Sequence, residues 1–79
     1  MTPEFNLFQD VGTEKFPAQI VGIRFDFNTR RFLYQLFIFN QYRVNLYFAG
    51  QIKQVEEDYA SLLWFDAAQI QKLKEIHAI

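Results

Sequence analysis

Residues 16–48 read FPAQIVGIRFDFNTRRFLYQLFIFNQYRVNLYF and hold ten of the fifteen aromatic residues of the chain. Their apolar side chains alternate with a period of two over three short runs. Alternation with that period is typical of β-strands, because successive side chains point to opposite faces of a sheet. The stretch therefore predicts a small antiparallel sheet that is held together by large rings.

The first of these runs, residues 16–28, changes its apolar phase near the middle. Residues 16, 18 and 20 are apolar on one face, whereas residues 21, 23, 25 and 27 are apolar on the other. Gly22 follows the change of phase and tolerates an unusual backbone, so we expect a β-bulge or a sharp bend at Ile20-Val21-Gly22. A strand bent in this way allows a small sheet to curl into a barrel.

The rest of the chain adds further elements around this strand. We expect strands over residues 32–40 and 42–48, a candidate strand over 51–55 and a fifth strand over 59–65. Residues 32–40 are apolar on both faces, which is typical of a central strand. Asp66 is a good N-cap for a helix over 66–78, and residues 1–15 are expected to form an arm or loop.

Length and composition restrict the classes of protein that the chain can belong to. Its 79 residues predict one domain, 1–79. There is no cysteine, which excludes disulfides and thiolate zinc sites and fits a cytoplasmic location. No apolar run approaches the ~20 residues that cross a bilayer, so we expect no membrane association. The net charge of −1 lacks the basic excess that is typical of nucleic-acid binders.

The residues that catalysis would need are scarce. His77 is the only histidine and Ser61 the only serine. Ser61 lies inside a strand pattern without the glycines of a nucleophile elbow, and His77 is interpreted as an exposed residue near the end of a helix. The acidic run 56–58 lacks the alternating spacing of a calcium loop. We therefore expect no catalytic, metal or cofactor site, and no enzyme.

Surplus aromatic rings are the first feature that could support binding. If the even-numbered residues of the second strand face the core, Phe37 and Phe39 lie on its opposite face, near Tyr47 of the next strand. An exposed apolar patch of this kind marks an interface. Three alternatives stay open: the helix or the arm covers the rings, a second copy covers them, or a foreign protein or nucleic acid does.

A group of arginines is the second such feature. Outward positions of neighbouring strands and the first turn carry the candidate ligand or nucleic-acid contacts Arg24, Arg30, Arg31 and Arg43. Arginine beside an exposed ring such as Tyr47 can hold phosphates and stack on bases. The alternative is a cross-strand ion pair, because Asp26 lies on the same face as Arg24.

The order of elements resembles the SH3-like small barrels of the Tudor and KOW type. The likeness covers roughly residues 10–70, and rests on the strands 18–23 and 32–36, a third short strand and a strand that contains Trp64 before a helical turn. Tudor domains hold methylated lysine or arginine in an aromatic cage. The rings that the resemblance offers for such a cage are Tyr34, Tyr42, Tyr47 and Trp64.

These patterns predict a mainly β fold, in which a bent, five-stranded antiparallel sheet forms an SH3-like barrel with a C-terminal helix. The alternative is an open α+β sheet with the helix across one face. For function we expect a small, non-enzymatic interaction module that forms a homo-oligomer through its aromatic sheet face. The alternative function is a nucleic-acid-binding barrel.

Overall fold

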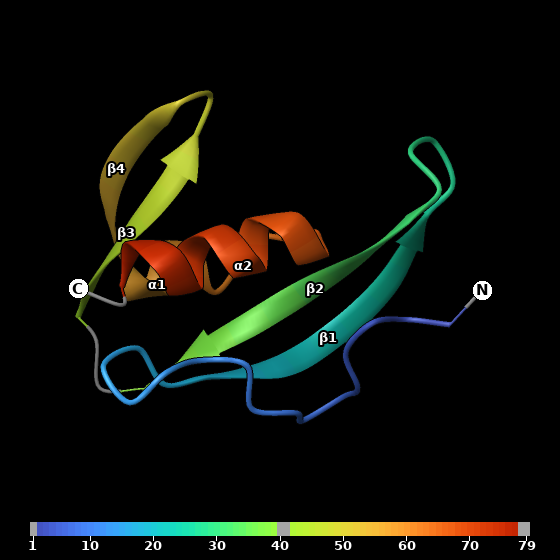
Figure 1. Ribbon diagram of the computed structural model, residues 1–79, viewed down its shortest axis with the longest axis horizontal. Coiled ribbons are helices and arrows are strands. Elements are labelled where there is room, and N and C mark those ends of the chain that lie inside the picture. Colours follow the sequence, from blue (N-terminus) through green and yellow to red (C-terminus); the bar gives the residue numbers. More distant parts are fainter. Residues whose placement is uncertain (1, 40–41, 78–79) are drawn as a thin grey trace.

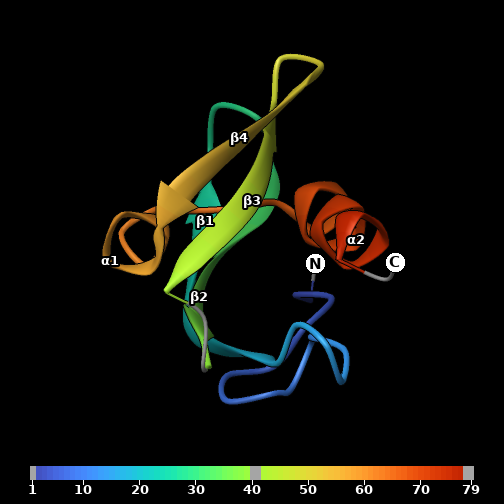
Figure 2. The same cartoon turned by 90° about the vertical axis from the view of Figure 1, so that its left-hand side faces the viewer.

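The computed structural model describes residues 2–39 and 42–77. Its elements in chain order are β1 (Ala18–Asp26), β2 (Arg31–Ile38), β3 (Arg43–Phe48), β4 (Gln51–Glu56), α1 (Glu57–Ala60) and α2 (Ala67–Ile76). The strands form two separate antiparallel pairs, β1–β2 and β3–β4 (Figure 1). The helices α1 and α2 lie on opposite sides of the β3–β4 hairpin (Figure 2).

The predicted five-stranded SH3-like barrel is wrong. The described residues form four strands in two unconnected sheets, so the fold is mixed α+β and no barrel closes. The alternative of one open sheet is wrong for the same reason. Phe65 explains the break, because its backbone pairs with Tyr34 on the side of β2 that faces away from β1. The N–H of Tyr34 donates to the Phe65 carbonyl at 2.7 Å, and the N–H of Phe65 donates back at 2.8 Å.

The predicted irregularity in the first strand is confirmed. The pairing of β1 with β2 shifts between Ile20 and Gly22, where one residue is left over on the β1 side. Gly22 also has little room, because a Cβ atom there would lie 3.0 Å from Oε1 of Gln35 and 3.1 Å from Cη2 of Trp64. The bulge therefore reorients the strand and also brings the Trp64 ring close to its backbone.

The fifth predicted strand, 59–65, is wrong. Residues 57–60 form α1, and only Phe65 makes a β-bridge. Glu57 and Asp58 lie in the first turn of α1, where the helix N-terminus favours negative charge, and Ala60 is buried. The acidic run 56–58 is therefore the end of β4 and the start of a helix. The candidate strand 51–55 is confirmed as β4.

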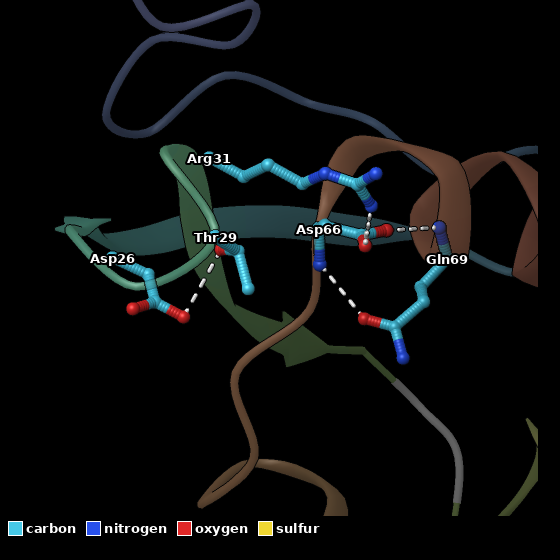
Figure 3. Close-up of polar contacts among 5 residues, drawn as sticks. All are labelled: Asp26, Thr29, Arg31, Asp66 and Gln69. Carbon is cyan, nitrogen blue, oxygen red and sulfur yellow. Dashed lines mark hydrogen bonds and ion pairs between the residues drawn. The ribbon is translucent and has the colours of Figure 1, made fainter.

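The start of the C-terminal helix is confirmed. Asp66 is the N-cap of α2: its Oδ1 accepts from the backbone N–H of Gln69 at 2.8 Å, and Gln69 Oε1 accepts from the N–H of Asp66 at 2.8 Å (Figure 3). This reciprocal pair is a capping box. The helix ends at Ile76, and the predicted end at 78 lies outside the described residues, as does the predicted end of the second strand at 40.

The core lies where the inner face of β1–β2 meets the β3–β4 hairpin and α2. Its largest fully buried side chains are Tyr34, Phe16, Ile20, Leu36, Leu46, Ile70 and Val44. The even-numbered residues of β2 point inward, which leaves Phe37 on the outer face. The N-terminal segment follows the free edge of β1, because the N–H of Phe8 donates to the Ile20 carbonyl at 2.7 Å and that of Val11 to Ala18 at 3.0 Å.

The turn of the β3–β4 hairpin carries a residue in an unfavourable conformation. Ala49 has φ 47° and Gly50 has φ 81°, both in the left-handed region. Two-residue hairpin turns of this kind prefer Asn-Gly, because asparagine adopts that conformation more readily than alanine. We expect Ala49→Asn to raise the free energy of unfolding by about 0.5 kcal/mol. Urea unfolding followed by circular dichroism tests this, and an unchanged or lower midpoint would contradict it.

Candidate functional site

The outer face of β1–β2 carries exposed apolar side chains close to one end of the hairpin. We call Val21, Phe37 and Phe39 the aromatic face. Phe37 is 45% exposed and Phe39 37% exposed, and their ring centroids lie 4.8 Å apart in edge-to-face contact. Val21 is 37% exposed and is the residue left over in the bulge of β1, between the Ile20–Leu36 and Gly22–Gln35 pairs. Phe39 lines a hollow together with Asp10, Gly12 and Thr13 of the N-terminal segment, yet each of the two rings keeps more than a third of its surface exposed in the described part of the chain.

The other part of this outer face is covered by the segment that follows α1. Gln35 donates from Nε2 to the Ser61 carbonyl at 2.9 Å, and Trp64 lies against Gly22. The guanidinium carbon of Arg24 lies 4.9 Å from the centroid of the Trp64 ring, a cation–π contact. The outer face of β1–β2 therefore has a half that the segment after α1 covers and a half that is open. The open half is the aromatic face.

Tyr47 does not join Phe37 and Phe39 as the sequence predicts. It belongs to β3, which pairs with β4 and not with β2. Its ring receives the ammonium group of Lys72 from α2, with Nζ 4.9 Å from the ring centroid. The misplacement has the same cause as the missing barrel, namely the break between β2 and β3.

The rings that the resemblance offers for a methyl-lysine cage are not equivalent in the structure. Tyr34 is 1% exposed and packs against Phe5, with ring centroids 5.1 Å apart. Its hydroxyl oxygen accepts from the backbone N–H of Glu4 at 2.8 Å. Tyr34 is therefore a core residue that fastens the N-terminal segment, and it cannot line an open cage.

Three of the four candidate arginines lie together at the turn end of β1–β2, whereas Arg43 lies on β3 in the other sheet. Arg31 donates to Oδ2 of Asp66 at 3.3 Å, across from the start of α2 (Figure 3). The predicted alternative, a cross-strand ion pair on this face, is not formed by Asp26 with any of these arginines. Asp26 instead accepts from the N–H of Asn28 at 3.0 Å and from the hydroxyl of Thr29 at 3.1 Å.

Two residues have roles that the sequence reading missed. Phe27 at the turn is 84% exposed, although its pattern assigned it to a strand face. The position of Phe27 next to the predicted turn could have indicated its exposure, because the pairing of β1 with β2 ends at Asp26 and Arg31. His77 is half-buried, contrary to the prediction. It stacks on Phe16 with ring centroids 4.1 Å apart, and its Nε2 lies 3.1 Å from the Asn45 carbonyl oxygen.

The described ranges, 2–39 and 42–77, contain no group of three or more acidic or histidine side chains placed to hold a metal ion. Within the same ranges, no helix is both long and apolar enough to cross a membrane. Comparison of the chain with family models, with curated proteins and with solved structures gives no match. The surfaces of the molecule are therefore the basis for any functional argument.

Proposed function

We propose that this chain is a small, non-enzymatic interaction module that self-associates through the aromatic face. The observation that carries the proposal is the open half of the β1–β2 outer face, where Phe37 and Phe39 are exposed while their rings contact each other. Contiguous apolar side chains on a folded surface are typical of contact sites, because their burial removes apolar area from water.

The arrangement of the aromatic face favours a contact between two identical copies. The face lies on a hairpin with regular pairing at Gln19–Phe37 and Ala18–Ile38, so its backbone is held in place before association. A twofold contact uses the same patch on both partners, which suits a small apolar patch that needs an equally apolar partner. The proposed product is a homo-oligomer.

We place the module in the cytoplasm. The absence of cysteine from all 79 residues supports this placement, because a small protein of an oxidising compartment commonly depends on disulfides. The aromatic core replaces such covalent support here.

Removal of the rings is expected to disperse the oligomer. Light scattering behind a sizing column measures the mass of the wild type over an about hundredfold range of concentration, because a mass-action equilibrium shifts with concentration. We expect the wild type to exceed the monomer mass, and Phe37→Ser combined with Phe39→Ser to return it to the monomer. Both side chains are partly exposed, so the variant should keep its circular dichroism spectrum.

The matched control is Ile52→Ser. Ile52 is an apolar residue on β4 that is 59% exposed and lies outside the aromatic face. This variant should associate like the wild type. A wild-type monomer at every concentration would refute the proposal, and so would equal dispersion by the control. Unfolding of the Phe37/Phe39 variant would mean that these rings are part of the core.

A further inference from the structure

The turn end of the β1–β2 hairpin, residues 24–31, projects from the rest of the molecule. We call it the hairpin finger. Figure 1 shows it extending past the N-terminal end of α2, away from the β3–β4 hairpin. It shares no residue with the aromatic face, so an inference about it does not depend on self-association.

Phe27 presents its ring to solvent at this end. It is the most exposed large apolar residue in the described part of the chain. The ring is supported from below, because Phe27 contacts Phe25 with centroids 5.0 Å apart and at 78°, and Phe25 contacts Phe32 at 5.0 Å and 69°. The contact with Phe25 supports one side of the Phe27 ring and leaves most of its surface open.

The turn itself is ordered by Asp26. One carboxylate oxygen accepts from the backbone N–H of Asn28. The other accepts from the hydroxyl of Thr29 (Figure 3). Arg30 has φ 56°, the left-handed conformation that closes the turn. Since both oxygens of Asp26 already have partners in the turn, its carboxylate is oriented toward the turn.

The hairpin finger is locally basic in a chain whose net charge is −1. Three arginines lie in it against one aspartate. Asp66 pairs with Arg31, but Arg24 and Arg30 make no ion pair with any described residue. The Arg24 guanidinium lies over the Trp64 ring, but no described carboxylate neutralises its charge or that of Arg30, so both groups can attract an anion.

Arg24 and Phe27 line the same depression. This hollow has a volume of about 370 Å³, and its other lining residues are Phe25, Asp26 and Asn28. The residues that line this hollow therefore include two phenylalanines, an arginine, an asparagine and the aspartate that orders the turn.

We propose that the hairpin finger binds single-stranded nucleic acid. A base stacks on the open ring of Phe27, and the adjoining phosphates contact Arg24 and Arg30. An exposed ring beside cationic side chains is the arrangement that recognises an unpaired base with its backbone, because every base has a π-face and every nucleotide a negative phosphate. An acidic peptide would satisfy the arginines but would leave the ring of Phe27 exposed.

Fluorescence anisotropy of a labelled oligothymidylate tests the proposal, at about 50 mM and about 200 mM salt. We expect binding that weakens with salt. Phe27→Ala should weaken it about tenfold, in keeping with the loss of one stacked base. Arg30→Gln should lower the slope of log affinity against log salt by about one.

Two controls match these variants. Tyr59→Ala removes an exposed ring from α1, and Arg43→Gln removes an exposed guanidinium from β3; both should bind like the wild type. The proposal is overturned by an absence of binding at the lower salt, by equal weakening in the controls, or by equal affinity for inorganic polyphosphate, which has no bases. The same measurements on the Phe37/Phe39 variant separate this result from the outcome for self-association.

Discussion

Replacement of Gly12 by alanine is expected to destabilise the fold severely. A Cβ atom at Gly12 would lie 1.9 Å from the Phe16 carbonyl oxygen and 2.4 Å from the Ala18 backbone nitrogen. Both neighbours are backbone atoms, so no side chain can rotate away to make room. The loop would have to open, which would break the bond from Val11 N–H to the Ala18 carbonyl and the pair between Thr13 and Phe16.

The expected cost is more than about 4 kcal/mol, which is a large share of the roughly 5–15 kcal/mol that stabilises a typical domain. Urea and thermal unfolding of the purified variant measure it. Gly50→Ala is the matched control: it has φ 81° and no atom within 4 Å of an added Cβ. Only backbone strain opposes that change, about 1–2 kcal/mol. Equal midpoints for Gly12→Ala and the wild type would disprove the crowding argument.

The features that sequence reasoning predicted correctly are local. The cap of α2 depends on Asp66 and on Gln69, which lies three residues later, so a short motif contains all the information. The bulge at Ile20–Gly22 likewise appears as a change of phase within one strand. Such features form from residues that are neighbours in the sequence, so they can be predicted without knowledge of the tertiary structure.

The sheet topology failed because strand pairing is not local. The pattern of residues 59–65 has the alternation of a strand, yet only Phe65 pairs, and it takes the edge of β2 that β3 would have needed. The spacing of these side chains does not indicate which segment will pair with the free edge of β2. A barrel and two separate hairpins therefore share one sequence pattern.

The candidate sites follow the same division. Alternation places Phe37 and Leu36 on opposite faces of β2, but residues 32–40 are apolar on both faces, so the sequence left open which of the two side chains is buried. Tyr47 could not be placed, because its position relative to Phe37 depends on the pairing between their strands. The β1–β2 hairpin alone is enough to predict that Arg24, Arg30 and Phe27 lie near one turn. The exposure of Phe27 could not be predicted, because it depends on which other parts of the chain pack against the turn.

Replacement of Phe16 by alanine is expected to lower the free energy of unfolding by about 3–5 kcal/mol, the usual cost of deleting a buried phenylalanine ring. Phe16 is 2% exposed and stands just before β1. Its ring stacks on His77 with an interplanar angle of 16°, which joins the start of β1 to the end of α2. Loss of the ring would therefore leave a cavity in the core and would also remove the contact between the start of β1 and the end of α2.

A double-mutant cycle separates the ring stack from the cavity. His77→Ala alone should cost about 1 kcal/mol, because it removes the stack and the polar contact with the Asn45 carbonyl. The pair Phe16→Ala and His77→Ala should then cost less than the sum of the single changes, since the second change finds no ring to lose. Urea unfolding of the four proteins measures this. Strict additivity would mean that the stack contributes nothing and that His77 is held by its polar contact alone.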